Sequence, residues 1–563
     1  MGKALRILIP LLPVYNHRLG VGYITAVLRA RGHEVIPIDF EHLLRIHDEA
    51  LSLRIQDETE VYADNWSEQI QYLHRPELLF GALFPEDFTL QRELNEMDWR
   101  LIAALRPHMQ AWVEAIVRME PDIVLMSTLV SNLWIVLWAS KLIHESMPAV
   151  PRVLGGRGIT YPEVQELILR AGWAEAILGG EAENSIAKLV DGLASGTSID
   201  GLAAPGLARM EGGRVVSVPT DADLVDLDSL PFPDLSGLPF PGATLRCYSE
   251  SGRDFHDAAS MATSRWCPHH CAYCYESIYP KNYRLRKVLS VVQEIEFQNS
   301  ILGTSRVFFC DSTLNVSSRW LGDLANQMGQ LPFKPRVLFA HCEPRHLNKD
   351  LLERMRDAGF EKLNFGVESL DDRTLRRMNR NTTVEETEDT LVAAAAAGIS
   401  LGLNFVANYP GETLEEFQHT LSEAKRFAER LRRVTEVSGA AVRFMVSQAR
   451  IDPHSALFVF HDRFGVHVLD RALPVPAELG PLRPLLDRIA LRWEGTLPKE
   501  ERQTRFAIAR PYLEGLSIPG TQSRVLPTLD SRSLLHPERI PSALQPLIPP
   551  QAAALSRESG AGP

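Results

Sequence analysis

Three cysteines within eight residues form the clearest chemical feature of the sequence. Cys267, Cys271 and Cys274 lie in the segment SRWCPHHCAYCYES, with three residues between the first two and two between the last two. Thiolates at such short spacing bind a metal ion or an iron–sulfur cluster. All six cysteines lie between Cys247 and Cys342. A secreted disulfide framework would spread them more widely, so we expect a reducing compartment and a cytoplasmic protein.

Two common kinds of metal site fit this spacing less well than a third kind. Structural zinc takes four ligands, usually as two pairs, and only one CxxC pair is present, with His269 and His270 cramped between the first two cysteines. A ferredoxin-type electron-transfer cluster takes four cysteines, usually at other spacings. Three thiolates can hold three irons of a 4Fe–4S cube and leave the fourth iron open to a ligand that binds through nitrogen and oxygen.

The cysteine segment follows the first strand of an alternating strand and helix series. Strand-like segments recur from about Ala258 to Pro453, and helical segments such as LLERMRDAG separate most of them: AASMATS, RVFFCDS, RVLFAHCE, KLNFGVES, LGLNFVANYP and AAVRFMVSQ. Six βα-type units predict a parallel partial (β/α)6 barrel over residues 258–453, with its functional groups at the carboxyl ends of the strands.

An earlier α/β series precedes this barrel. LRILIPLL, HEVIPIDF, PDIVLMS, PRVLGGRG and AEAILGG indicate buried strands, and GVGYITAVLRARG indicates a helix. They predict a flavodoxin-like parallel-sheet domain over residues 1–222, with a helical insertion at about 41–119. A proline-rich linker (223–257) follows, and residues 454–563 form a small C-terminal region with a mobile tail.

Charge and hydropathy exclude other classes of protein. The net charge of −12 argues against a nucleic-acid partner, because phosphates demand a basic surface. The apolar start, MGKALRILIPLLPVY, lacks a signal-peptide cleavage site and fits a buried strand. No apolar run reaches the roughly 18 residues that a membrane span needs, so we expect no such span.

The cysteine segment resembles the CxxxCxΦC motif of the radical SAM enzymes, with Tyr273 as the aromatic residue. The resemblance implies that the three cysteines bind a 4Fe–4S cluster and that S-adenosylmethionine chelates its open iron. Three further barrel segments match this superfamily: FFCDSTLN, GFEKLNFGVESLDDRTLRRMNR and LNFVANYPGET. They suggest contacts to S-adenosylmethionine from Tyr273, Asp311, Glu368 and Asn404. Asn404 and Asn408 replace glycines of the usual pattern, and we expect Glu412 to begin or cap the next helix.

The front domain resembles the cobalamin-binding domain that precedes the barrel in one large subgroup of these enzymes. A proline-rich loop, a GHEV segment, PDIVLMS, a GG pair and GEAE occur in the order of that subgroup. Small residues let the backbone approach the cofactor's nucleotide tail, and polar strand ends can hydrogen-bond it. The implied contacts are His17, Ser127, Thr128, Gly155, Gly156, Gly180 and Glu181. The alternative is a flavodoxin-like domain whose pocket holds another ligand or none.

His17 is the candidate for a lower cobalt ligand, but its setting is incomplete. Cobalamin proteins with such a ligand carry DxHxxG, and here His17 and Gly20 are in register while Tyr15 replaces the aspartate. That aspartate would orient the histidine and raise its basicity. We therefore expect His17 to lie near the lower corrin face without binding cobalt.

The resemblance implies a cobalamin-dependent radical SAM enzyme, most often a C-methyltransferase acting on an unactivated carbon of a small metabolite, lipid or peptide. Such an enzyme uses one S-adenosylmethionine as methyl donor, cleaves a second to 5′-deoxyadenosine, and needs a low-potential electron donor, a flavodoxin or ferredoxin. One alternative is a non-methylating member that performs oxidative cyclisation or ring rearrangement. The other is a non-catalytic iron–sulfur electron-transfer protein. The sequence names neither the substrate nor a catalytic residue.

The substitution of aspartate by Tyr15 leads to a spectroscopic prediction. His17→Ala should retain most of the bound cobalamin, because the histidine lacks the partner that would make it a strong ligand. The EPR spectrum of the cobalt(II) form should be the same in both proteins and lack nitrogen superhyperfine splitting. A nitrogen coupling in the parent that disappears in the variant would make His17 a ligand.

Overall fold

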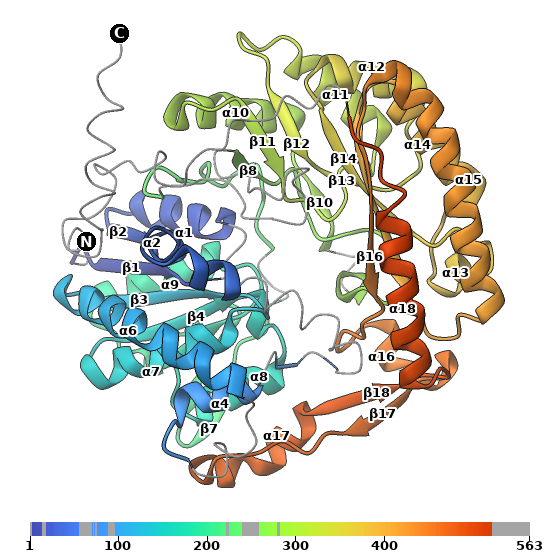
Figure 1. Cartoon of the computed structure of the whole chain (residues 1–563). Coiled ribbons are helices and arrows are strands. Elements are labelled where there is room, and N and C mark those ends of the chain that lie inside the picture. The colour runs from blue at the N-terminus through green and yellow to red at the C-terminus, as the bar shows by residue number, and fades with distance from the viewer. Residues whose placement is uncertain are drawn as a thin grey trace.

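The computed structural model describes residues 3–13, 18–55, 70, 72–73, 76–87, 96–220, 224–238, 258–278 and 282–520 of the 563-residue chain. Two α/β units lie side by side, the first half of the chain at the left of Figure 1 and the barrel strands at the right. Tyr15, Asn16 and His17 lie outside the described residues. The predictions for them therefore stay predictions.

The front sheet has the strand order β2-β1-β3-β4-β5-β6-β7. Its strands are β1 (Arg6–Leu11), β2 (Glu34–Asp39), β3 (Ile123–Thr128), β4 (Arg152–Gly156), β5 (Ala176–Leu178), β6 (Leu207–Glu211) and β7 (Arg214–Ser217). The first five are parallel and the last two pair antiparallel at the edge. This is the flavodoxin-like order, so that prediction is confirmed, and ligands of such sheets bind at the carboxyl ends of the strands.

Helices cover both faces of the front sheet. On one face, α1 (Leu19–Arg29) and α9 (Glu183–Ala194) share a core with β1 side chains such as Ile7 and Ile9. The other face is covered by α2 (Phe40–His47), α4 (Pro76–Leu83), α6 (Glu96–Arg118), α7 (Leu133–Ser146) and α8 (Pro162–Arg170). The described parts of the predicted insertion at 41–119 are thus mainly helical. None of the helices in the described ranges is long and apolar enough to cross a membrane.

The described residues of the second unit form seven parallel strands in six barrel positions. They are β8 (Ala259–Met261), β11 (Arg306–Phe309), β12 (Arg336–Phe339), β13 (His341–Cys342), β14 (Lys362–Glu368), β15 (Ser400–Ala407) and β16 (Val442–Gln448). Hydrogen bonds join β12-β11-β8 and β13-β14-β15-β16, and a bridge between Val337 and Phe360 connects the two groups. Only Ala340 separates β12 from β13, so the two strands share one position. The prediction of a partial (β/α)6 barrel is confirmed.

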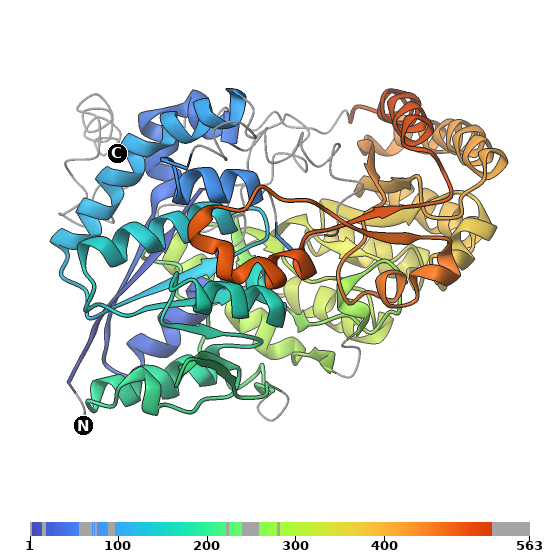
Figure 2. The ribbon, with the colours of Figure 1, turned by 90° about the horizontal axis from the view of Figure 1, so that it is seen from below.

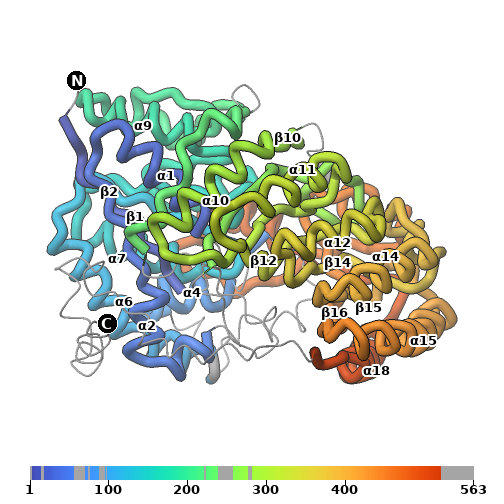
Figure 3. Tube along the Cα trace, turned by 90° about the horizontal axis from the view of Figure 1, so that it is seen from above, coloured from blue at the N-terminus to red at the C-terminus, as the bar shows by residue number. Residues whose placement is uncertain are grey.

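Helices surround the outside of the barrel and bury its outward-facing strand residues. They are α10 (Val288–Leu302), α11 (Ser318–Met328), α12 (Lys349–Asp357), α13 (Asp372–Arg377), α14 (Val384–Ala396) and α15 (Leu414–Ser438). In the view from above, these helices run along one long side of the barrel and α10 lies close to α1 of the front unit (Figure 3). β8 and β16 form the open edges among the described barrel strands. The barrel is therefore a half-closed wall rather than a complete cylinder.

The C-terminal region connects the two units. It contains α16 (Ala456–Val459), β17 (His467–Asp470), α17 (Arg483–Ile489), β18 (Leu491–Glu494) and α18 (Lys499–Glu514). The antiparallel pair β17–β18 reaches the front unit, where Ile70 N donates to Leu491 O at 3.1 Å and Arg471 pairs with Glu77. Viewed from below, this segment passes under both units (Figure 2). The chain then returns to the barrel, where Ile518 pairs with Val442.

The described part of the proline-rich segment, residues 224–238, packs between the two units. Asp234 pairs with Arg29 of α1 at 2.5 Å, and its backbone N–H donates to Gly22 O at 3.0 Å. Gln298 of α10 donates to Pro233 O at 2.8 Å. The side chains of Leu235 and Leu238 are fully buried. This stretch therefore holds α1 against α10, although it contains no regular helix or strand.

Candidate functional site

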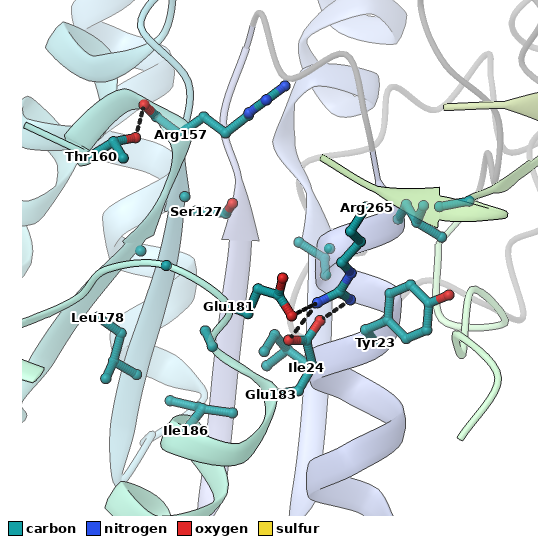
Figure 4. Close-up of a pocket in the computed structure, with 18 of the residues that line it drawn as sticks. Tyr23, Ile24, Ser127, Arg157, Thr160, Leu178, Glu181, Glu183, Ile186 and Arg265 are labelled. Carbon is teal, nitrogen blue, oxygen red and sulfur yellow. Dashed lines mark hydrogen bonds and ion pairs between the residues drawn. The ribbon is translucent and has the colours of Figure 1, made fainter. Parts of the chain in front are cut away.

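A cavity of about 390 Å³ lies where the carboxyl edge of the front sheet faces the barrel. The front unit lines it with residues in or after β1, β3, β4 and β5, and the barrel unit lines it with residues after β8 and β11. Figure 4 shows this wall, with Ser127 at a strand end and Arg265 of the barrel unit reaching across to the front unit. Five of the predicted front-unit residues line this cavity: Ser127, Gly155, Gly156, Gly180 and Glu181. Of the predicted barrel residues, Asp311 lines it, whereas the three cysteines, Tyr273, Glu368 and Asn404 are not among its lining residues.

The predicted front-domain contacts around β3 and β4 form a close-packed backbone cradle. Ser127, Gly155 and Gly156 line the cavity, and Thr128 Oγ1 donates to Gly155 O at 2.9 Å behind it. Gly156 has φ +101°, and a Cβ there would lie 2.4 Å from Thr128 O. Only glycine accepts that conformation without strain. The cradle therefore presents bare backbone to the cavity, as a bulky cofactor tail requires.

Gly180 and Glu181 also line the cavity, but Glu181 contacts the barrel unit. Gly180 has φ +73° and turns the chain after β5. Glu181 accepts hydrogen bonds from Arg265 at 3.0 Å and from Trp266 Nε1 at 3.1 Å, and it pairs with Arg284. Its carboxylate is therefore engaged by the barrel unit as well as lining the predicted cobalamin pocket.

The three cysteines lie on the cysteine loop, residues 266–274, which follows β9 (Ser264–Arg265). Trp266 opens the loop at φ +65°, and the Cys274 N–H donates to Cys271 O at 3.1 Å. None of the three forms a disulfide; Cys271 is buried and the other two are half-buried. Among the described residues, no three acidic, histidine or cysteine side chains form a ready single-ion site. An iron–sulfur cube is larger than one ion, so its thiolates stand further apart.

Burial sets the protonation of these thiols. It raises the pKa of Cys267 to about 12 and that of Cys274 to about 12, and it raises the pKa of Cys271 against the opposing pull of Arg380. Without bound iron, the three cysteine side chains are therefore protonated thiols rather than thiolates. Iron would displace the protons, because coordination deprotonates a thiol outright. The donor set fits a cluster whose positive irons replace those protons.

Residues after β14 and α13 hold the back of the cysteine loop. The Ala272 N–H donates to Met378 O at 2.9 Å, and Asn379 Nδ2 donates to His270 O at 2.6 Å. Arg380 donates to Cys271 Sγ at 3.3 Å and is itself held by Glu343 at 2.8 Å. These contacts give a role to the MNR end of the barrel segment that resembled the radical SAM pattern. The sequence alone did not predict that role.

Asp311, predicted to meet the methionine amino group, is buried at the end of β11 and anchors the turn before the loop. Its Oδ1 accepts from Thr263 N at 3.0 Å, Thr263 Oγ1 at 2.8 Å, and Ser264 N and Oγ at 2.6 Å each. Asp311 also lines the cavity. The geometry makes it a positioning residue for the start of the loop.

Glu368 and Tyr273 lie together at the end of β14, close to Arg380. Glu368 has φ +64°, after a break in the strand register beyond Gly366. Burial raises the pKa of its carboxyl, while Arg380 and a hydrogen bond from Tyr273 favour the charged form. The centres of the Tyr273 and Tyr409 rings lie 6.3 Å apart in an edge-to-face arrangement. The structure thus brings two of the four predicted S-adenosylmethionine contacts into one group beside the cysteine loop.

The last predicted contact, Asn404, is half-buried in β15 and pairs with Met445 in register. Asn408 has φ +61°, which explains why the related pattern carries glycine there.

The prediction that Glu412 begins or caps the next helix is wrong. Thr413 caps α15 in a capping box with Glu416. Glu412 is instead buried and accepts from the Asn408 N–H at 3.1 Å.

Comparisons with known proteins agree with this arrangement. The profile of the Radical SAM superfamily matches residues 261–424. An uncharacterized methyltransferase of Pyrococcus horikoshii is 26% identical over 311 residues, 55% of this chain and 65% of that protein. The anaerobic magnesium-protoporphyrin IX monomethyl ester cyclase of Cereibacter sphaeroides is 24% identical over 348 residues, 61% of this chain and 54% of that protein. The matched part thus spans less than two thirds of either relative's length.

Two solved structures have a similar overall fold. One is the radical S-adenosylmethionine methyltransferase TsrM from Kitasatospora setae, with cobalamin and a 4Fe–4S cluster bound; it aligns with TM-score 0.58 and 17% identity over 92% of this chain and 90% of that chain. The other is the cobalamin-dependent S-adenosylmethionine radical enzyme OxsB with aqua-cobalamin bound, with TM-score 0.58 and 14% identity over 89% of this chain and 66% of that chain.

Residues 261–424 of the chain therefore carry a radical SAM domain. The overall fold of the chain is that of the cobalamin-dependent radical SAM enzymes. The resemblance seen in the cysteine motif and in the front domain is confirmed at the level of domain and fold. The assignments of individual site residues stay predictions.

A pair of glycine substitutions tests the cradle. Gly172→Ala should cost about 1 kcal/mol of unfolding free energy, because φ is +68° there but nothing lies within 4 Å of the new Cβ. Gly156→Ala should cost about 3 kcal/mol or more, because strain at φ +101° adds to a backbone clash at 2.4 Å. Thermal melting and hydroxocobalamin binding of both variants measure this. Equal effects of the two substitutions would contradict the cradle.

Proposed function

We propose that the protein is a cobalamin-dependent radical SAM C-methyltransferase that acts on an unactivated carbon of a small metabolite, lipid or peptide. The observation that carries this proposal is the single cavity shared by the front-sheet loops and the start of the cysteine loop. A carbon radical formed beside the cluster needs a methyl source within reach, and a shared cavity supplies that proximity.

The residues present fit both cofactors. Cys267, Cys271 and Cys274 would hold the cluster, and the backbone cradle at Gly155 and Gly156 would hold the cobalamin tail. When bound, the cluster with S-adenosylmethionine supplies hydrogen-atom abstraction and cobalamin supplies the methyl group. A flavodoxin or ferredoxin is the proposed electron donor. Tyr273, Asp311, Glu368 and Asn404 are the proposed surroundings of S-adenosylmethionine.

The chain's own contribution is orientation and exclusion of water. Asp311 fixes the turn before the loop, and Arg380 holds Cys271 from behind. Apolar side chains such as Ile9, Leu125 and Leu178 line the deeper front wall of the cavity. A dry, fixed site protects a reactive carbon radical from side reactions.

A second candidate function is oxidation without methylation, such as ring closure. The similarity to the magnesium-protoporphyrin monomethyl ester cyclase supports it, because that relative shares 24% identity over 61% of this chain. A non-catalytic electron-transfer protein is the third candidate. A cavity that extends from the predicted cobalamin region to residues beside the cysteine loop disfavours it, because electron transfer alone needs no such space.

The cluster assignment predicts about four irons per chain after anaerobic reconstitution. Replacing Cys267, Cys271 and Cys274 together by Ala should remove the iron, the brown colour and the formation of 5′-deoxyadenosine. Cys342→Ala is the matched control, because Cys342 is buried on β13 outside the loop and should leave the iron content unchanged. S-adenosylmethionine cleavage by the triple variant would show that the assignment is wrong.

Product stoichiometry tests methylation itself. We expect one S-adenosylhomocysteine and one 5′-deoxyadenosine per methylated product, and the transfer of all three deuterons from methyl-deuterated S-adenosylmethionine. Mass spectrometry of the products measures both. S-adenosylhomocysteine without 5′-deoxyadenosine would indicate polar methyl transfer. 5′-Deoxyadenosine with a product of unchanged carbon count would exclude methylation and support the cyclase.

A further inference from the structure

Both ends of the cysteine loop are ion-paired to the front unit. Arg265 stands two residues before Cys267, and Glu276 stands two residues after Cys274. Arg265 pairs with Glu181 and Glu183, which follow β5, and Glu276 pairs with Arg157, which follows Gly156 of the cradle. The pairing of Arg265 with Glu181 and Glu183, and the pairing of Arg157 with Glu276, are called the flanking ion pairs. Their front-unit partners belong to the segments that line the cavity.

The Arg265 pair is buried and connected on several sides. The side chains of Arg265, Glu181 and Glu183 are 18%, 10% and 7% exposed. Arg265 Nη1 donates to Glu181 Oε2 at 3.0 Å and to Glu183 Oε2 at 3.0 Å, and its guanidinium lies 5.3 Å from the centre of the Tyr23 ring. Figure 4 shows the guanidinium between the two carboxylates. Such a buried, multiply bonded cation has one favourable position.

The Arg157 pair differs because one partner faces open space. Glu276 is 9% exposed and also accepts from Ser312 Oγ, whereas the Arg157 side chain is 63% exposed and lines the cavity. An ion pair in contact with water contributes little, because water screens the charges. A ligand that fills the cavity excludes that water. The attraction between Arg157 and Glu276 then strengthens, since charges interact more strongly at lower dielectric.

We propose that the flanking ion pairs position the cysteine loop and that the Arg157 pair couples occupancy of the cavity to the geometry of the cluster site. This inference rests on the proposed function, because it takes cobalamin as the occupant of the cavity. Arg265 sets the position of the first cysteine at all times. Arg157 and Glu276 stiffen the end of the loop after Cys274 when the cavity is filled.

Coupling between two binding sites is reciprocal. If filling the cavity favours the cluster-bound loop, then building the cluster must tighten cobalamin binding by the same factor. Couplings of this kind usually lie in the range of about 5- to 150-fold. The ratio of dissociation constants between cluster-free and reconstituted protein measures this factor. A direct contact between Arg157 and the corrin would change both constants alike and cancel in the ratio.

The experiment measures hydroxocobalamin binding by equilibrium dialysis to the full chain, with and without the reconstituted cluster. The wild-type ratio should be about 5-fold or more. Arg157→Gln and Glu276→Gln should each reduce the ratio to about 1 while keeping the iron content. Glu361→Gln is the matched control, because it breaks the partly buried Arg336–Glu361 pair on the barrel and should keep the wild-type ratio.

The Arg265 pair is tested by the EPR spectrum of the reduced cluster with S-adenosylmethionine. Arg265→Gln should shift the g-values with or without hydroxocobalamin, and Arg265→Lys, which keeps the charge, should shift them less. A wild-type ratio of 1, or an Arg157→Gln variant that retains the wild-type ratio, overturns the coupling. Unchanged g-values in Arg265→Gln overturn its positioning role. A wild-type protein that binds no hydroxocobalamin would instead contradict the proposed function.

Discussion

The position of the cysteine loop depends on charges buried between two sheets. The guanidinium of Arg265 lies between Glu181 and Glu183, which come from the other unit. Taking these ions out of water is costly unless each is paired, and loss of one partner from such a buried pair typically costs about 3–5 kcal/mol. Apolar surfaces can shift relative to each other at little cost, whereas buried charges must keep the one geometry that pairs them. The front unit therefore fixes the start of the loop as strictly as the barrel does.

The barrel side of the loop depends on the same principle. Asp311 gathers backbone and hydroxyl donors of the turn before the loop, and Arg380 joins Cys271 to Glu343 behind it. Buried polar groups without partners are unfavourable, so each of these contacts discourages alternative loop conformations. The C-terminal region also connects the two units, because β17–β18 contacts the front unit while α18 packs on β16. The two units are thus joined by the proline-rich segment at 224–238, by the C-terminal region and by the flanking ion pairs.

The sequence was sufficient to predict the parallel strands of both units, whereas the sites at their carboxyl ends stay predictions. Period and composition identify buried parallel strands such as RVFFC, and short motifs mark glycine cradles and thiol loops. The helix cap at Thr413 was also within reach, because T-x-x-E is a capping-box signature and Glu416 stands in the right place. The prediction instead named Glu412, which directly precedes Thr413 in the PGET segment. The β17–β18 pair was missed because a long segment containing α17 separates its strands.

The contacts between the units could not be derived from spacing. Arg265 and Glu181 lie 84 positions apart in the chain, and no local pattern specifies which of 59 basic and 71 acidic side chains will meet. Their pairing is decided by how two twisted sheets approach each other. Yet both partners stand near motifs that could be recognised: Arg265 lies two residues before the first cysteine, and Glu181 follows Gly180, which turns the chain after β5. A charged residue beside each of two cofactor motifs is a signal for contact between them. Under the proposed function, such a contact would hold the two cofactors at a fixed separation, which a radical formed at one and captured at the other requires.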